Sequence, residues 1–198
     1  MGTLQVGGTT LATKNSSTGK VDLSANYRPP AGGVIEQFMS PCDGSSITVQ
    51  SGTYTVENVT AQQEFTTNFV DLTGSSISYT PPTGTQTVIY NFNVFQCYVD
   101  TAHIVFYKLF LDGTEVSNFH NCDASQQANY EEKRLHFTWA LNIGGTPSTA
   151  NGRVASWTSA KTIKMQVKEN SLNHEAKAHF SPNTGGLSLP VIGITALG

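Results

Sequence analysis

Two histidines in the stretch HEAKAH, His174 and His179, are of a residue type that could bind a metal. A zinc-protease site needs two histidines four positions apart on one face of a helix. Here the histidines are five positions apart, and in a strand that odd spacing sends their side chains to opposite faces. The stretch therefore predicts a strand with two separate histidines and no metal site.

Two other groups of residues could do chemistry. His120 and Cys122 would share one face of a strand, but no further ligand stands at a metal-site spacing. Glu131 and Glu132 are adjacent, so on a strand they would face opposite sides and would not form the carboxylate pair of a glycosidase. The sequence also contains no serine elbow and no glycine-rich phosphate loop. We therefore expect a protein that is not an enzyme and uses no metal and no cofactor.

Composition limits the partners of the chain. Its 198 residues are 13% charged with a net charge of −3, too few charges and of the wrong sign for a nucleic-acid partner. No apolar run approaches the roughly 18 to 20 residues of a membrane span, and the first residues lack the pattern of a signal peptide. Three cysteines without a CxxC spacing favour reduced thiols, with one disulfide and a leftover thiol as the alternative.

From residue 34 onward, short runs of Thr, Val, Tyr, Phe and Ile are separated by Gly, Pro, Asn, Asp and Ser. Apolar and polar residues alternate in RLHFTWALNI and KTIKMQVKE, as in strands with one buried face. Asp112-Gly113 predicts a two-residue type I′ turn. The sequence predicts an all-β fold over residues 34–198, an antiparallel β-sandwich of the jelly-roll type. Further strands are expected near residues 34–38, 45–49, 53–57, 64–70, 75–80, 174–180 and 189–197.

Two segments, TPPTGTQTVIYNFNVFQCYVDTAHIVFYKLFLDGTEV and GRVASWTSAKTIKMQVKEN, resemble virion-associated β proteins of marine phages and large algal viruses. The resemblance covers roughly residues 75 to 197, and such domains are similar in layout to trimeric jelly rolls of the C1q/TNF type. The opening LQVGGTTLATKNSSTGKVDL resembles the N-terminal arms of marine phage tail and fibre proteins. The resemblance implies a structural or adhesive component of a virus particle that forms a homotrimer.

Aromatic and β-branched residues occupy both faces of QTVIYNFNVFQCYV and HIVFYKLF. A strand that is apolar on both sides is either central in a sandwich or has its outer face against another subunit. We expect these strands to line the trimer axis. The candidate trimer-interface residues are Tyr90, Phe92, Phe95, Tyr98, Phe106, Tyr107 and Phe110.

Residues 1–33 form an expected extended N-terminal arm, in which fourteen residues are Gly, Ser or Thr. No helix or strand period runs through it, and its apolar side chains are sparse. Ordering about thirty residues costs on the order of 30 kcal/mol of backbone entropy, which six small apolar side chains do not offset. We therefore expect a neighbouring protein to order the arm. The candidate anchoring residues are Leu4, Val6, Leu11, Val21, Leu23 and Tyr27.

The sequence thus predicts a structural protein of a phage particle, a homotrimeric short tail or head fibre or a host-recognition knob. A capsid decoration protein and a glycan-degrading tail enzyme are the alternatives. The expected partners are further copies of the chain, other virion proteins bound through the arm, and a host surface glycan, with no nucleic acid and no membrane insertion. The loops at residues 123–130 and 144–152 are long enough to hold a ligand. We expect the protein in the virion, made in the host cytoplasm without a signal peptide.

Overall fold

The computed structural model describes residues 2–14, 16–17, 21–23, 31–98, 103–125, 131–171, 176–181 and 185–198. Regular structure in these ranges is β-strand, apart from one short 3-10 turn, η1 (Thr149–Asn151). None of the helical structure in these ranges has the length and apolar character needed to cross a membrane.

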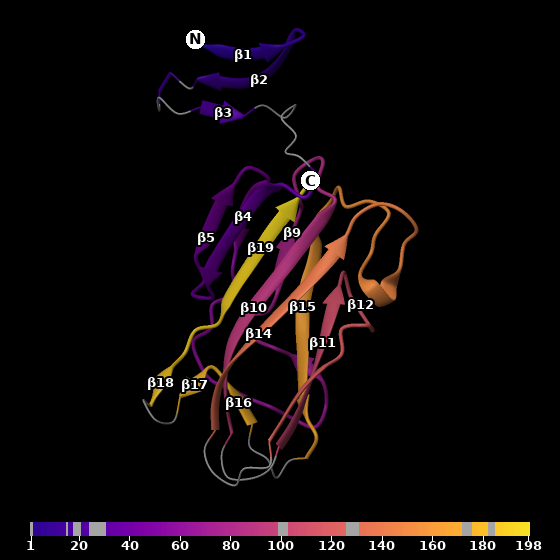
Figure 1. Cartoon of the computed structure of the whole chain (residues 1–198). Coiled ribbons are helices and arrows are strands. Elements are labelled where there is room, and N and C mark those ends of the chain that lie inside the picture. The colour runs from indigo at the N-terminus through magenta and orange to yellow at the C-terminus, as the bar shows by residue number, and fades with distance from the viewer. Residues whose placement is uncertain are drawn as a thin grey trace.

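Eight strands build a sandwich of two antiparallel sheets (Figure 1). Across the first sheet the order is β4 (Val34–Pro41), β19 (Val191–Leu197), β10 (Thr87–Tyr98) and β14 (Glu131–Asn142). Across the second sheet the order is β9 (Ile77–Tyr79), β15 (Lys161–Glu169), β11 (His103–Leu111) and β13 (Asn121–Ser125).

The pairing of these eight strands is that of a jelly roll. In chain order they are β4, β9, β10, β11, β13, β14, β15 and β19. The first strand pairs with the last, the second with the seventh, the third with the sixth, and the fourth with the fifth. A long hairpin rolled into two packed sheets has this pairing. The predicted all-β antiparallel jelly-roll sandwich is therefore confirmed.

Short strands extend the two sheets and close the ends of the sandwich. On the first sheet, β16 (Ala176–Ala178) follows β19 along the edge of β10 and pairs with β7 (Gln63–Glu64). On the second, β8 (Val70–Asp71) pairs with β15 and β12 (Thr114–Glu115) pairs with β11. Two hairpins pair only within themselves, β5 (Ser46–Val49) with β6 (Gly52–Thr55) and β17 (Phe180–Ser181) with β18 (Gly186–Leu187).

The core between the sheets is filled by the alternate residues of the long strands. On β15, Ile163, Met165 and Val167 are buried while Lys164 and Gln166 between them are half-buried, as the alternation predicts. The turn after β11 has φ of 53° at Asp112 and 79° at Gly113, the positive values that a type I′ turn requires. The largest fully buried side chains include Tyr79, Tyr90, Phe92, Tyr98, Leu109, Leu141, Met165, Ile192 and Ile194.

The N-terminal arm forms a small sheet of its own, which the sequence does not predict. Its strands are β1 (Thr3–Val6), β2 (Thr9–Lys14) and β3 (Val21–Leu23), antiparallel and in that order. Gly7 and Gly8, with φ of 57° and 82°, form the tight turn that brings β2 back along β1. The backbone of the arm therefore pairs with itself. Where the chain enters the sandwich, the Gly198 N–H donates to the Gly33 carbonyl at 2.9 Å.

Candidate interaction surfaces

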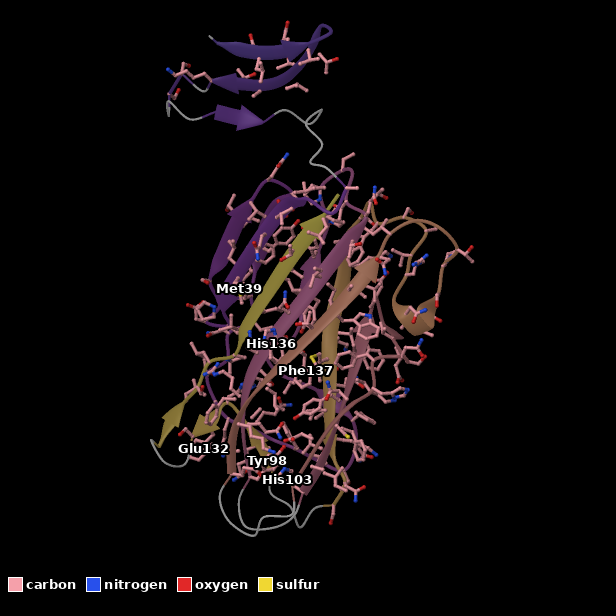
Figure 2. All side chains as sticks on the ribbon, viewed as in Figure 1. Met39, Tyr98, His103, Glu132, His136 and Phe137 are labelled. Atoms are coloured by element: carbon pink, nitrogen blue, oxygen red, sulfur yellow. The ribbon has the colours of Figure 1, made fainter. Side chains whose placement is uncertain are left out.

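The outer face of the first sheet is uncharged over most of its area. Paired outward residues on β10 and β14 include Asn91 with Thr138, and the Thr138 hydroxyl donates to the Asn91 side-chain oxygen at 2.8 Å. Figure 2 labels Met39 on β4 and His136 on β14, which lie toward two sides of this face. We call its uncharged part the amide face. It consists of Gln37, Met39, Thr87, Ile89, Asn91, Asn93, Thr138, Ala140, Asn142, Val191, Gly193 and Thr195.

The outer face of the second sheet is charged. Lys164 and Lys168 on β15 and Lys108 on β11 all face outward. The Lys164 ammonium lies 2.7 Å from the Asp71 carboxylate, and that of Lys168 lies over the Phe106 ring. Charged residues are depleted from the centres of protein interfaces and are common on surfaces in water. The charged face therefore suits solvent, whereas the amide face suits contact with another protein.

The structure separates the seven candidate trimer-interface residues into two groups. Four of them are at most 3% exposed and belong to the core of a single chain: Tyr90, Phe92, Tyr98 and Tyr107. Phe95, Phe106 and Phe110 are half-buried on the outer faces, but Phe95 lies on the first sheet and the other two on the second. One flat contact cannot include both outer faces, so the seven residues do not form a single trimer interface, and the prediction was wrong in this respect.

Aromatic residues on both faces of β10 and β11 have a local explanation. Their inward rows fill the core, and cationic side chains from neighbouring strands lie over the outward rings. The Arg134 guanidinium lies 5.9 Å from the centre of the Phe95 ring, and the Lys168 ammonium lies 5.3 Å from that of Phe106. Such cation–π contacts shield the outward rings from water without a partner subunit.

The arm exposes apolar side chains. Leu4 and Val6 on β1 are 61% and 63% exposed, and Leu11 on β2 is half-buried. Val21 and Leu23 belong to β3. Tyr27 lies outside the described residues. The arm sheet therefore presents at least two apolar side chains that a partner could cover.

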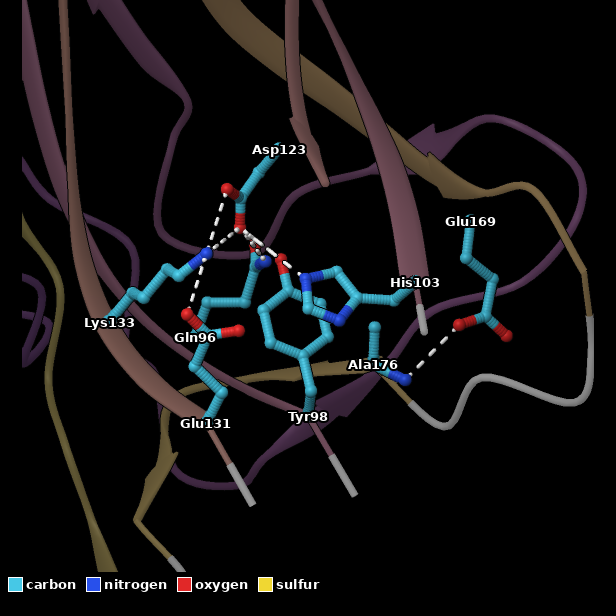
Figure 3. Close-up of polar contacts among 8 residues, drawn as sticks. All are labelled: Gln96, Tyr98, His103, Asp123, Glu131, Lys133, Glu169 and Ala176. Carbon is cyan, nitrogen blue, oxygen red and sulfur yellow. Dashed lines mark hydrogen bonds and ion pairs between the residues drawn. The ribbon is translucent and has the colours of Figure 1, made fainter. Parts of the chain in front are cut away.

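Polar side chains gather between the sheets at the end of the sandwich far from the C-terminus (Figures 2 and 3). Asp123 on β13 accepts hydrogen bonds from the Tyr98 hydroxyl and, at 3.3 Å, from the Gln96 amide, both on β10. The ring of His103 on β11 stacks on that of Tyr98, and its Nε2 lies 3.8 Å from Asp123 Oδ2. Burial raises the pKa of Tyr98, and the Asp123 carboxylate adds to that shift. Asp123 thus cross-links the two sheets.

The same cluster contains two carboxylates, those of Asp123 and Glu131, that contact one ammonium. The Lys133 ammonium lies 3.1 Å from Asp123 Oδ1 and 2.9 Å from Glu131 Oε1. A glycosidase needs one carboxyl group that is free to give its proton to the substrate, but here one ammonium forms ion pairs with both carboxylates. Burial would lower the pKa of Lys133, yet its hydrogen bonds to Glu131 and Asp123 outweigh that and raise it. The arrangement therefore suits a link between sheets better than acid–base catalysis.

The adjacent glutamates face opposite sides of β14, as predicted. Glu131 points between the sheets toward Lys133, whereas Glu132 accepts a hydrogen bond from the Ser181 hydroxyl at 2.8 Å. No group of three or more His, Cys, Asp or Glu side chains in the described ranges is placed to hold a metal ion.

The three cysteines are free thiols. Cys42 and Cys97 are buried, and burial raises the pKa of Cys42 to about 12 and that of Cys97 to about 11. Cys122 is exposed on β13, in register with Phe106. The two buried thiols therefore stay protonated and unreactive at neutral pH.

His179, from the HEAKAH stretch, is fully buried and has an unusual backbone. It lies between β16 and β17 with φ of 67°, a value that residues other than glycine rarely adopt. Its N–H donates to the Phe95 carbonyl and its carbonyl accepts from the Ser188 N–H, each at 2.8 Å. Burial lowers the pKa of His179 to about 4. His174 lies outside the described residues.

The low pKa of His179 predicts a loss of stability in mild acid. An unfolded histidine has a pKa near 6.5, so between pH 6.5 and 4 the unfolded chain binds a proton that the folded chain excludes. The free energy of unfolding should therefore fall by about 2 kcal/mol between pH 7.5 and 5 because of this residue alone. Urea unfolding at the two pH values measures the fall.

A His179→Asn variant should lose this part of the pH dependence, because asparagine tolerates positive φ and does not titrate. His136→Asn, on an exposed position of β14, is the matched control and should keep it. Equal pH dependence in His179→Asn and the unmodified chain would contradict the assignment.

One of the two loops that are long enough to hold a ligand lies wholly within the described residues. Residues 126–130 of the first lie outside the described residues. In the second, residues 144–152 run from the end of β14 through η1, and the Trp139 indole donates to the Asn151 carbonyl at 3.2 Å. The Asn118 amide donates to the Asn151 side-chain oxygen at 2.7 Å. This loop is therefore packed against the sandwich.

Comparison with known proteins assigns no family, because neither a family model nor a curated protein matches the chain. Two solved structures of infectious bursal disease virus are similar to it. That of the Gx strain matches with a TM-score of 0.38 and 10% identity, over 82% of this chain and 37% of that one. That of the Gt strain matches with a TM-score of 0.27 and 11% identity, over 89% and 46%. The chain spans less than half the length of either, and its fold is assigned from its own strand pairing.

Proposed function

We propose that this chain is a structural protein of a virus particle, a homotrimeric short tail or head fibre or a host-recognition knob. The amide face is the observation that carries the proposal. Charged residues are depleted at the centres of interfaces. On the outer face of the first sheet the charged residues, Glu132, Arg134 and Lys177, lie only toward one end, and the rest of that face is uncharged across four strands, while the opposite face has three lysines. The resemblance of residues 75–197 to trimeric jelly rolls supports three copies rather than another number.

The arm would attach the trimer to the rest of the particle. Leu4 and Val6 are exposed apolar side chains that suit a binding partner. Residues 1–33 have three basic residues and one acidic residue, a net charge of +2, which leaves −5 for the remainder of the chain. An acidic surface on a neighbouring virion protein would complement this charge.

Two other functions are weaker candidates. A capsid decoration protein would be favoured by a chain that stays monomeric and binds a particle through its arm. A glycan-degrading enzyme has the carboxylates of Asp123 and Glu131 in its favour, but both form ion pairs with Lys133, which leaves neither free for a substrate.

A charge placed on the amide face should break the assembly. Met39 on β4 is 55% exposed on this face, and Ile104 on β11 is 37% exposed on the opposite face. Met39→Glu would bury a carboxylate in the contact, so we expect at least a tenfold weaker trimer by analytical ultracentrifugation. Ile104→Glu is the matched control and should leave the trimer intact. Equal effects of the two variants, or none, would argue against the amide face as the contact.

A further inference from the structure

A small cavity opens between the β11–β12 turn and the loop that follows β14. Its volume is about 170 Å³. Pockets for drug-sized ligands have about 300 to 1,000 Å³, so this one suits a ligand smaller than those. Its lining includes apolar side chains, the hydroxyl-bearing Thr114 and Thr149, and the cationic Arg153. The apolar lining residues include Leu111, Val116 and Val154.

Arg153 differs from the other cations of the sandwich. Within the described ranges its guanidinium has no hydrogen bond or ion pair and lies beside Gly145. The other seven Lys and Arg residues of 34–198 each contact an acid, a hydroxyl or an aromatic ring. A guanidinium can grip a planar carboxylate with two parallel hydrogen bonds. The cavity therefore has a cation ready for an anionic ligand.

The net charge at the cavity is that of a single cation. Lys161 also lines it, but its ammonium lies 3.0 Å from the Asp112 carboxylate, and the two charges cancel. A ligand with one negative charge would complement Arg153, whereas the second charge of a phosphate would find its other cation, Lys161, already paired with Asp112. The charge balance favours a carboxylate.

The segment that carries Arg153 is fixed before any ligand arrives. Ser148 and Arg153 exchange two backbone hydrogen bonds of 3.0 and 2.9 Å. The Val154 N–H donates to the Asn142 carbonyl at 3.0 Å, which ties the segment to the end of β14. Gly152 has φ of 69°, which turns the chain sharply before Arg153. Little backbone entropy would therefore be lost on binding, and the ordering cost would fall on the Arg153 side chain.

We propose that this cavity binds the carboxylate of an acidic sugar, a uronic or a sialic acid, through Arg153. The hydroxyls of Thr114 and Thr149 suit the hydroxyl groups of the sugar ring, and the apolar lining suits its C–H face. The inference rests on the proposed function, for which it names the class of host glycan that a recognition knob would contact.

The test is titration of the full chain, followed by NMR, with galacturonate, N-acetylneuraminate and the neutral methyl ester of galacturonate. We expect one of the two acids to bind with a dissociation constant on the order of 1 mM and the ester to bind at least tenfold more weakly. Arg153→Gln should weaken the acid at least tenfold. Arg134→Gln removes the other described arginine, on the outer face of β14, and should leave binding unchanged.

Three results would overturn the inference: no binding of either acid, equal binding of the ester, or full binding by Arg153→Gln. The molar mass of the same samples distinguishes a failure of the acidic-sugar site from a failure of the proposed trimer. A trimer that ignores acidic sugars would overturn only the acidic-sugar site. A monomer that binds them through Arg153 would instead contradict the trimeric knob.

Discussion

Phe92→Ala should lower the free energy of unfolding by about 3 to 5 kcal/mol, the range for removing a buried phenylalanine ring. Phe92 is 0% exposed and lies in register with Phe137 on β14 and Ile192 on β19. Both neighbours are themselves buried in well-paired strands, so they cannot move in to fill the cavity. Urea denaturation followed by tryptophan fluorescence measures the loss.

Phe95→Ala, three positions along the same strand, is the matched control. Phe95 is half-buried on the outer face, with Arg134 over its ring. Removing the Phe95 ring should lower the free energy of unfolding by about 1 kcal/mol, because only part of this ring is buried on folding. The loss in Phe92→Ala should also be independent of protein concentration. If the Phe92→Ala chain were as stable as the unmodified chain but no longer assembled, Phe92 would instead belong to a subunit interface.

Gly152→Ala should lower the free energy of unfolding by about 2 to 5 kcal/mol, the second largest loss that we predict. With φ of 69° the added side chain brings conformational strain, and its Cβ would clash with a Leu141 methyl group and crowd Val116 at 3.2 Å. Leu141 is fully buried and cannot swing away. Thermal unfolding of the variant measures the combined cost.

Gly144→Ala isolates the two causes. Gly144 has φ of 94°, but no atom of the described residues lies within 4 Å of the place that an added methyl group would take. Its substitution should therefore cost only the strain, about 1 to 2 kcal/mol. Equal destabilisation by Gly144→Ala and Gly152→Ala would show that the contact with Leu141 does not matter.

Local patterns in the sequence are enough to predict the fold class. The alternation Ile163, Met165, Val167 requires one buried face, and Asp112-Gly113 requires a tight hairpin. Both signals depend only on residues close together in the sequence, so they can be interpreted without knowledge of tertiary contacts. The pairing of the first strand with the last joins residues far apart in the chain and is one of several arrangements open to such strands, so local patterns do not predict it.

The surroundings of the aromatic residues cannot all be predicted in the same way. The alternation of Asn91 and Asn93 with buried Phe92 favours Phe92 as an inward residue of β10. Phe95 then continues the row of the two asparagines, and the sequence does not show what covers its outward ring. In the structure Arg134 on β14 lies over that ring, a contact that depends on strand register. The cavity around Arg153 gives no signal either, because Leu111, Val116 and Lys161 reach it from distant parts of the chain.

The strands of the arm cannot be predicted from the sequence, for a different reason. Gly7 and Gly8 resemble part of a flexible stretch, although two adjacent glycines can also form the turn of a hairpin. The apolar side chains of β1 are too few to indicate a buried face, and Leu4 and Val6 are indeed exposed. The sheet is organised by backbone pairing, which the composition of the arm does not indicate.

The molar mass of the full-length protein in solution, measured by light scattering, tests the central claim most directly. If the amide face closes a homotrimer, the mass should be about 64 kDa, three times the 21.2 kDa of one chain. A mass of 21.2 kDa at micromolar concentration would contradict the trimer and would favour a decoration protein that attaches singly through its arm.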